Sequence, residues 1–296
     1  MKPYYQNELT TIYNGDCLDV MDYLIEQGIK FDAIITDPPY GTTACKWDNV
    51  IPFDKMWERL NKLSNKTTPI ILFGSQPFTS TLVMSNIDEY KYDWVWDKVQ
   101  KGNFLNALKQ PLRSNELISV FYKNQCTYNP QMTTGHIKKE VKNIKRKTVD
   151  LYNEQSGTQN YSSTERFPHS IITFPKDTQT SSLHPTQKPI ALLQYLIKTY
   201  TNKNDLILDF TSGSFTTSVA SEQLNRRSIG IELEQKYCDI GIKRLNSLQI
   251  KFDYRRDNVA EVKITTAILR KWIKILETDG INAREIIIDK LKDLIK

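Results

Sequence analysis

Residues 31–40 read Phe-Asp-Ala-Ile-Ile-Thr-Asp-Pro-Pro-Tyr, and this stretch indicates the fold class. The apolar run Phe31–Ile35 is typical of a strand that is buried on both faces of a parallel sheet. The segment Asp37–Tyr40 follows directly, so we expect it at the carboxyl end of that strand. Because open α/β sheets bind their ligands at this edge, the stretch predicts both a sheet and the place of a site on it.

Strand-like and helix-like segments alternate along most of the 296 residues. This alternation predicts a doubly wound, mostly parallel α/β sheet of the Rossmann type. Apolar runs predict strands at 31–36, 69–74, 92–96, 117–122, 205–210 and 227–233. Helical spacing predicts helices at 17–27, 53–64, 77–86, 189–200 and 218–224. We expect one catalytic domain over 1–250 and a helical C-terminal extension over 251–296.

Composition argues against a membrane-spanning chain and against a disulfide scaffold. The net charge is +6, with a pI near 8.9, which is the sign expected of a nucleic-acid-binding protein. No apolar stretch is long enough to span a bilayer. The four cysteines, Cys17, Cys45, Cys126 and Cys238, are scattered without Cys-x-x-Cys spacing. This spacing predicts reduced thiols in a cytoplasmic protein and no metal site.

Positive charge is concentrated at 138–147, inside a polar segment that covers about 123–182. The run has six basic side chains against one acid, and tyrosines are interleaved with the polar residues around it. Such side chains reach phosphates and base edges, so the segment favours a DNA-facing insertion over an ordinary solvated surface. The residues expected to bind DNA are Lys138, Lys139, Lys142, Lys145, Arg146 and Lys147.

The Asp37–Tyr40 segment offers the groups needed to methylate an exocyclic amino group of a base. The lone pair of such an amino group is delocalised, so its nitrogen needs two acceptors that draw it toward tetrahedral geometry. Asp37 offers a carboxylate oxygen and Pro38 its backbone carbonyl, and the consecutive prolines restrict φ. Tyr40 offers a ring on which an extruded base can stack. Taken alone, the segment leaves open an ordinary turn with a surface aspartate.

A cofactor site is predicted around the strand Asp205–Asp209, which leads into a turn of small residues and a helix. Glu232 ends the next strand, about twenty residues after the turn, where an acid accepts hydrogen bonds from ribose hydroxyls. No Gly-Lys-Ser/Thr phosphate loop is present in the sequence. A cofactor with a ribose and no phosphate therefore fits, and S-adenosylmethionine is one.

These motifs together resemble the permuted, β-class amino-methyltransferases of DNA, in which the catalytic motif precedes the cofactor motif. Many restriction-modification and bacteriophage enzymes have this order. The resemblance covers nearly all of 10–245. It rests on the segments Asn14–Cys17, Asp37–Tyr40, Leu72–Phe78, His184–Pro189, Asp209–Thr217 and Gly230–Glu232.

The resemblance implies S-adenosylmethionine as the cofactor and double-stranded DNA as the substrate. An aspartate at position 37 is similar to the adenine-N6 branch, whereas cytosine-N4 enzymes more often carry serine there. The implied activity is methylation of adenine N6 by base flipping and direct in-line transfer. The resemblance implies no membrane partner, and it leaves open a homodimer and a cognate restriction endonuclease.

The same resemblance implies a role for each site residue. The catalytic set would be Asp37, Pro38, Pro39 and Tyr40. Asp16 would contact the adenine of the cofactor, Glu232 would bind its ribose, and Asp209 would lie at its methionine end. The complete cofactor set would be Asp16, Cys17, Lys188, Asp209, Thr211, Gly213, Ser214, Thr217 and Glu232.

One residue departs from the family's pattern. The Gly-x-Gly turn of the family reads Gly213-Ser214-Phe215 here. A second glycine would allow a positive φ or a close approach of backbone to ligand. Either Phe215 points away from the turn or the affinity for the cofactor is weakened. The alternatives to an adenine-N6 enzyme are a cytosine-N4 methyltransferase and a DNA-binding homologue with little catalysis.

Overall fold

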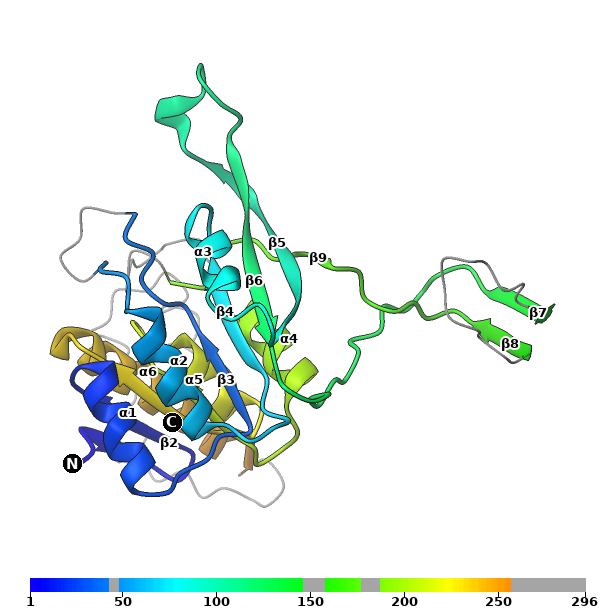
Figure 1. Ribbon diagram of the computed structural model, residues 1–296. Helices are drawn as coiled ribbons and strands as arrows, with labels where there is room; N and C mark the ends of the chain where they lie inside the picture. The colour runs from blue at the N-terminus through cyan, green and yellow to red at the C-terminus, as the bar shows by residue number, and fades with distance from the viewer. Residues whose placement is uncertain (43–47, 146–157, 177–186, 257–296) are drawn as a thin grey trace, which may run out of the picture. The chain divides into compact units, whose positions relative to one another are not determined.

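The computed structural model describes residues 1–42, 48–145, 158–176 and 187–256 (Figure 1). The chain comprises two compact units, Met1–Asn246 and Ser247–Lys296. The first unit contains the sheet and the predicted site. No helix among the described residues is long and apolar enough to cross a membrane.

A nine-stranded sheet organises the described part of the first unit, in the order β1-β2-β11-β10-β3-β4-β6-β5-β9 (Figure 1). Five neighbouring strands, from β2 to β4 in that order, are parallel, and β6 runs antiparallel between β4 and β5. This arrangement confirms the predicted doubly wound, mostly parallel α/β fold. The strands are β1 (Tyr5–Gln6), β2 (Thr10–Asn14), β3 (Ala33–Thr36), β4 (Ile70–Gly74), β5 (Tyr90–Gly102), β6 (Arg113–Phe121), β9 (Ile171–Thr173), β10 (Leu206–Asp209) and β11 (Arg227–Glu232).

Helices cover both faces of this sheet. On β3, Ile34 packs into the core that includes α1, α2 and α3, whereas Ala33 and Ile35 pack into the core that includes α4 and α5. Burial on both faces explains why the strand is apolar at consecutive positions rather than at alternate ones. The helices are α1 (Cys17–Glu26), α2 (Phe53–Leu63), α3 (Phe78–Met84), α4 (Ile190–Tyr200), α5 (Thr216–Gln223) and α6 (Gln235–Arg256).

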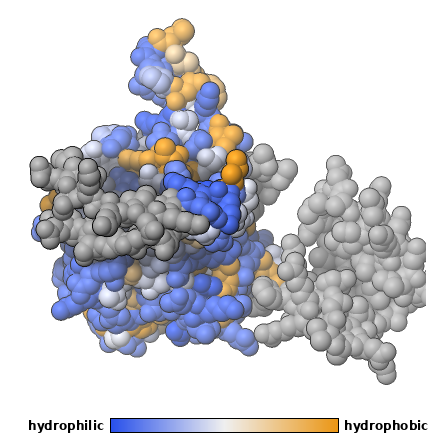
Figure 2. Space-filling view, turned by 90° about the vertical axis from the view of Figure 1, so that its right-hand side faces the viewer, coloured by the Kyte–Doolittle hydropathy of each residue, from blue (hydrophilic) through white to orange (hydrophobic). Residues whose placement is uncertain are grey.

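The predicted strands and helices coincide with observed elements to within a few residues, except that β5 and β6 are longer than expected. The two strands form a long hairpin, whose tip carries the exposed apolar side chains Phe104, Leu105 and Leu108 (Figures 1 and 2). α6 continues to Arg256, past the expected boundary at 250. The rest of the expected helical extension, residues 257–296, lies outside the described residues.

The expected insertion at 123–182 contains elements of two kinds. β7 (Lys139–Lys145) and β8 (Thr158–Ser163) pair antiparallel as a separate two-stranded sheet. β9, by contrast, lies parallel to β5 at the end of the main sheet. The last part of the expected insertion is therefore a strand of the main sheet.

Four neighbouring parallel strands bring acidic residues to one edge of the sheet. Glu232 and Asp209 end β11 and β10, while Asp16 and Asp37 come shortly after β2 and β3. β10 leads through α5 to β11 on one side, whereas β3, on its other side, leads through α2 to β4. Ligands bind in open α/β sheets at such a reversal of the winding direction. The fold therefore places the two predicted sites side by side.

Candidate active site

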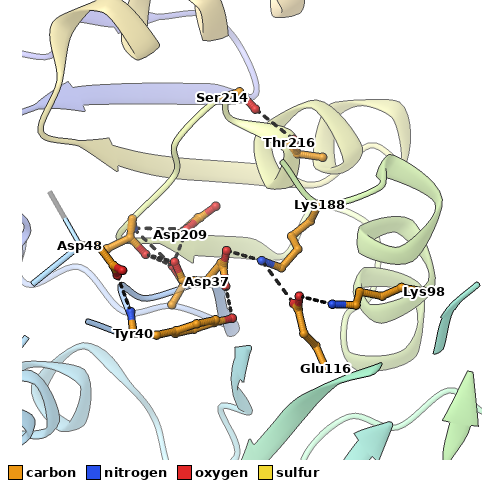
Figure 3. A network of polar contacts seen from close by, with 11 residues as sticks. Asp37, Tyr40, Asp48, Lys98, Glu116, Lys188, Asp209, Ser214 and Thr216 are labelled. Atoms are coloured by element: carbon orange, nitrogen blue, oxygen red, sulfur yellow. Dashed lines mark hydrogen bonds and ion pairs between the residues drawn. The ribbon is translucent and has the colours of Figure 1, made fainter. Parts of the chain in front are cut away.

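Asp37 lies directly after β3, and its two carboxylate oxygens have different partners (Figure 3). Oδ1 accepts a hydrogen bond from the hydroxyl of Tyr40 at 2.5 Å, and Oδ2 is paired with the ammonium group of Lys188. Burial is the largest influence on the pKa of Asp37 and raises it, while Lys188 acts in the opposite direction. The ammonium group therefore favours the ionised carboxylate in a site that would otherwise favour the neutral acid.

Asp48 fixes the loop that carries Tyr40. Its Oδ1 accepts hydrogen bonds from the backbone N–H groups of Tyr40 at 2.8 Å and Gly41 at 2.9 Å, and its Oδ2 accepts one from Thr42 at 2.9 Å. Asp48 is buried, so these charge-assisted bonds satisfy a carboxylate that has little access to water. The ring of Tyr40 packs against Phe78, with ring centroids 5.0 Å apart. The orientation of Tyr40 is therefore set from both its backbone and its ring.

Lys188 connects Asp37 to two charged residues on the β5–β6 hairpin, the half-buried Glu116 and the buried Lys98 (Figure 3). Its Nζ lies 3.6 Å from Oε2 of Glu116, whose Oε1 is 2.9 Å from Nζ of Lys98. The ammonium group also lies over the ring of Phe73, 5.2 Å from its centroid. Burial lowers the pKa of Lys188, but the carboxylates of Asp37 and Glu116 more than offset it and raise that pKa. Lys188 is therefore a buried cation held by two acids.

Side-chain hydrogen bonds connect the catalytic segment to the turn after β10. The hydroxyl of Thr36 donates to Oδ1 of Asp209 at 2.5 Å, and the hydroxyl of Thr211 donates to the backbone carbonyl of Asp37 at 3.0 Å. Asp209 is buried, and burial raises its pKa to about 6. The two predicted sites thus share a hydrogen-bond network across neighbouring strands.

Glu232 holds the other side of this turn. Its Oε2 accepts a hydrogen bond from the N–H of Gly213 at 2.8 Å, and its Oε1 accepts one from the N–H of Glu234 at 2.8 Å. Burial raises the pKa of Glu232 to about 7. After the neighbouring strand β2, Asp16 caps α1 by accepting a hydrogen bond from the N–H of Leu18 at 2.8 Å. The edge therefore presents carboxylates, which accept hydrogen bonds from hydroxyl and ammonium groups.

Phe215 points away from the turn and into the interior. Its backbone is left-handed, with φ 60° and ψ 35°, and its side chain is fully buried. The ring lies against Gly230 of β11 and Gly241 of α6, so closely that a Cβ on Gly230 would stand 2.6 Å from a ring atom. Of the two alternatives that the sequence left open for Phe215, this is the first. The family's second glycine is thus replaced by a residue that keeps a positive φ and fills space beside two other glycines.

Arg244, which sequence reasoning missed, supports the same turn from α6. Its guanidinium donates to the backbone carbonyl of Ser214 at 2.5 Å and to the hydroxyl groups of Ser214 and Thr216 at 3.0 Å each. The hydroxyl of Ser214 donates in turn to Oε1 of Gln187 at 3.1 Å. The turn is therefore bonded to α6 and to the segment just before α4.

The remaining predicted cofactor residues lie in different surroundings. Cys17 is the half-buried first residue of α1, and Thr217 is buried in the first turn of α5. Lys188 belongs to the segment before α4 as expected, but its ammonium group pairs with Asp37. Sequence reasoning also missed the partners of the catalytic segment, Asp48, Glu116 and Lys98.

Three of the predicted DNA-binding residues, Lys139, Lys142 and Lys145, lie in β7 of the separate two-stranded sheet. Lys138, just before β7, and Lys139, its first residue, are both exposed. Lys142 and Lys145 are also in β7, and their side chains are not described. Arg146 and Lys147 lie outside the described residues.

Comparison with known proteins relates this site to DNA modification. A family model described as DNA methylase matches residues 31–243 of the chain. The type II methyltransferase M.HinfI of Haemophilus influenzae is 27% identical over 281 residues, which cover 84% of this chain and 72% of that protein. The DNA adenine methyltransferase YhdJ of Escherichia coli (strain K12) is 26% identical over 291 residues, covering 93% of this chain and 95% of that protein.

A solved structure of a complex with S-adenosylmethionine is also similar to this chain. The crystal structure of an M1.HpyAVI–SAM complex superposes on this chain with a TM-score of 0.55 and 26% sequence identity. The match covers 80% of this chain and 100% of that chain.

Proposed function

Because the chain belongs to the N6/N4 family of DNA methylases, we propose that it methylates N6 of adenine in duplex DNA, with S-adenosylmethionine as its cofactor. One contact carries the proposal. The hydroxyl of Thr211, in the turn after β10, donates to the carbonyl of Asp37, after β3, at 3.0 Å. This contact supports a base site directly beside the cofactor turn, as transfer between two bound molecules requires.

The donor set at the sheet edge suits S-adenosylmethionine, which carries hydroxyl and ammonium groups and no phosphate. Glu232 would accept hydrogen bonds from the ribose, Asp16 would face the adenine, and Asp209, Thr211 and Ser214 would line the methionine end. When bound, S-adenosylmethionine supplies a methyl group on a sulfonium sulfur, and the electrons of the S–C bond return to sulfur as the new N–C bond forms. The inward position of Phe215 leaves the turn free of its ring.

Asp37 and Pro38 would act on the amino group of the extruded base. The amino group would donate one hydrogen to the Asp37 carboxylate and the other to the Pro38 carbonyl, which localises the lone pair on nitrogen. Tyr40 would stack on the base. The nitrogen becomes cationic as it bonds to the methyl carbon, and it then loses one proton, which Asp37 would accept. Acceptors already in place stabilise this developing charge without reorganisation.

We propose adenine rather than cytosine as the target base because the catalytic segment begins with Asp37. The family covers both amino groups, so cytosine N4 is the second candidate, with the same geometry of acceptors. Nucleoside mass spectrometry on unmethylated duplex DNA, incubated with the protein and S-adenosylmethionine, separates them. We expect N6-methyladenine; N4-methylcytosine would correct the base, and no methylated nucleoside in the presence of DNA binding would contradict the proposed activity.

We also propose that the basic residues from Lys138 to Lys147 contact the DNA backbone. The slope of log K against log salt is negative, and each phosphate contact that is lost should reduce its magnitude by about 0.9. Replacing the exposed pair Lys138 and Lys139 with glutamine should therefore weaken binding and flatten this slope. An unchanged slope would show that these side chains are only solvated.

Two partners remain proposals of the same kind. The relationship to type II methyltransferases supports a cognate restriction endonuclease. The homodimer that the sequence left open is the second proposal. Light scattering after size exclusion measures the second, and a single-subunit mass would contradict it. We also keep the cytoplasmic location expected from the cysteine spacing as part of this proposal.

A further inference from the structure

Glu116 has one carboxylate oxygen that makes no hydrogen bond to any described residue. Its Oε1 is paired with Lys98 at 2.9 Å, but its buried Oε2 lacks a hydrogen-bond donor. The nearest ammonium group is that of Lys188, whose Nζ lies 3.6 Å away, just beyond hydrogen-bond distance. Leaving a buried charged acceptor unsatisfied is costly, so such an atom in a folded protein calls for an explanation.

Asp37 is in the opposite state, because both its oxygens are already engaged. Tyr40 donates to one and Lys188 is bonded to the other. The proposed reaction requires an amino group of the base to donate to the same carboxylate. Lys188 therefore competes with the amino group for the carboxylate oxygens of Asp37. Glu116, by contrast, has an acceptor oxygen, Oε2, without a hydrogen bond.

A short shift of Lys188 would give Oε2 of Glu116 a hydrogen-bond donor and would free Oδ2 of Asp37. A movement of its ammonium group by less than about 1 Å would bring it within hydrogen-bond distance of Oε2 of Glu116. The other charged groups near this position are Lys98, which stays on Oε1 of Glu116, and the exposed Lys176. The rings of Tyr40 and Phe73, which the ammonium group faces at 6.0 and 5.2 Å, would continue to stabilise the cation during the shift.

We propose that Glu116 is a positioning residue that takes over the ammonium group of Lys188 when the amino group of the target base takes Asp37. Lys188 is then bound to Asp37 before the base enters and to Glu116 during methyl transfer. The number of buried charges is the same in both states, and in the second state Asp37 keeps its hydrogen bond from Tyr40 and gains one from the amino group of the base. This inference rests on the proposed function, because it assigns a step to the same site.

Glu116→Gln tests the inference, because the amide keeps the shape of the side chain and removes its charge. Lys188 would then remain on Asp37 after the base has entered. Under saturating S-adenosylmethionine and DNA, the single-turnover rate should fall by at least about tenfold. Cofactor affinity, and base flipping measured by 2-aminopurine fluorescence at the target position, should stay close to those of the parent.

Removing the competitor should relieve the defect. In Glu116→Gln combined with Lys188→Met, no ammonium group occupies Asp37, and burial alone then raises the pKa of that carboxyl group. The double variant should therefore be faster than Glu116→Gln at alkaline pH, where Asp37 is ionised. A purely structural role for Glu116 predicts the reverse order, because the double variant loses more contacts.

Glu89→Gln is the matched control. Glu89 forms an ion pair with Lys123, with 3.6 Å between Oε1 and Nζ, and neither residue belongs to the proposed site. This variant should retain the parental rate. A Glu116→Gln rate within about threefold of the parent, or a double variant no faster than Glu116→Gln, would overturn the inference. If the parent methylates DNA, either result refutes only the role of Glu116; a parent that forms no methylated base refutes the proposed function, and this inference with it.

Discussion

The ring of Phe215 occupies the space that a side chain on Gly241 would need. A Cβ built on Gly241 would overlap the ring, and one on Gly230 would stand 2.6 Å from it. Two glycines on different elements, β11 and α6, thus make room for one phenylalanine from the cofactor turn. The departure from the family's turn sequence is therefore matched by complementary packing around Phe215.

Phe215→Gly should destabilise the protein and leave its affinity for S-adenosylmethionine unchanged. Deleting a buried phenylalanine side chain costs about 3–5 kcal/mol. Relief of the left-handed backbone at φ 60° returns only about 1–2 kcal/mol. Denaturant unfolding measures the loss, and calorimetry measures the affinity. A variant that is as stable as the parent and binds the cofactor more tightly would show that the ring impairs the turn.

Gly241→Ala tests the packing from the other side. The added methyl group would meet the ring of Phe215, and the backbone of α6 cannot easily move away from it. We therefore expect a loss of about 1–3 kcal/mol of stability from overpacking. In a Phe215→Ala background the same methyl group enters vacated space, and its cost should largely disappear. Additive losses in the double variant would contradict direct contact between the two positions.

Asp48→Ala should remove the hydrogen bonds that hold the loop with Tyr40 in place. Three backbone N–H groups lose a charged acceptor, and a net hydrogen bond to a charged group contributes about 1.5–3 kcal/mol. We expect a loss of stability of a few kcal/mol and a lower single-turnover rate, because Tyr40 is no longer held against Phe78. Asp48→Asn, which keeps one acceptor oxygen, should lie between the parent and Asp48→Ala. Equal rates for all three proteins would exclude a role of Asp48 in positioning Tyr40.

The elements that could be predicted from the sequence are those whose signal is local. Phe31–Ile35 is a continuous apolar run because β3 is buried on both faces, and Asp37–Tyr40 follows it without a gap. Lys188 could be assigned to the right segment but not to its partner. Its contact with Asp37 joins residues 151 positions apart, and only the packing of α4 on the sheet brings them together.

The sequence does contain a signal for the ion pair of Lys98 and Glu116 on the β5–β6 hairpin. Trp94, Trp96 and Lys98 alternate along β5, and Glu116, Ile118 and Val120 alternate along β6. In each strand the charged residue is in phase with buried apolar residues, and those apolar residues all belong to one core cluster. A lysine and a glutamate in phase with core residues on paired strands predict a buried ion pair.

Replacing Asp37 should separate catalysis from cofactor binding. Asp37→Asn keeps the shape of the side chain but loses the charge, so the single-turnover rate should fall by about a thousandfold or more. The affinity for S-adenosylmethionine should change by no more than about threefold. Substantial residual turnover would contradict the role of Asp37 as acceptor.

Asp37→Ala should destabilise the protein by less than the about 3–5 kcal/mol that breaking a buried pair from one side costs, because Lys188 can shift to Glu116. Denaturant unfolding measures the loss. Adding Lys188→Met should restore much of the lost stability without restoring activity. A loss of the full ~3–5 kcal/mol would show that Glu116 does not take over Lys188, which would contradict the proposed shift.

Glu232 should make the stability of the cofactor-free protein depend on pH. Its pKa is about 7 in the folded chain against an ordinary 4.5, because burial penalises the carboxylate. A folded state that holds its proton more tightly than the unfolded state gains stability below pH 4.5 and loses it as the pH rises through 7. Relative to Glu232→Gln, which cannot ionise, the parent should therefore lose up to about 3 kcal/mol over this window and no more above it. Asp209 titrates in both proteins, so most of its contribution cancels when the two unfolding curves are subtracted, and what is left reflects its repulsion of the Glu232 carboxylate. A difference that stays flat with pH would mean that the Glu232 carboxyl group is already ionised at pH 4.5, held by the backbone N–H groups that it accepts from rather than neutralised by burial.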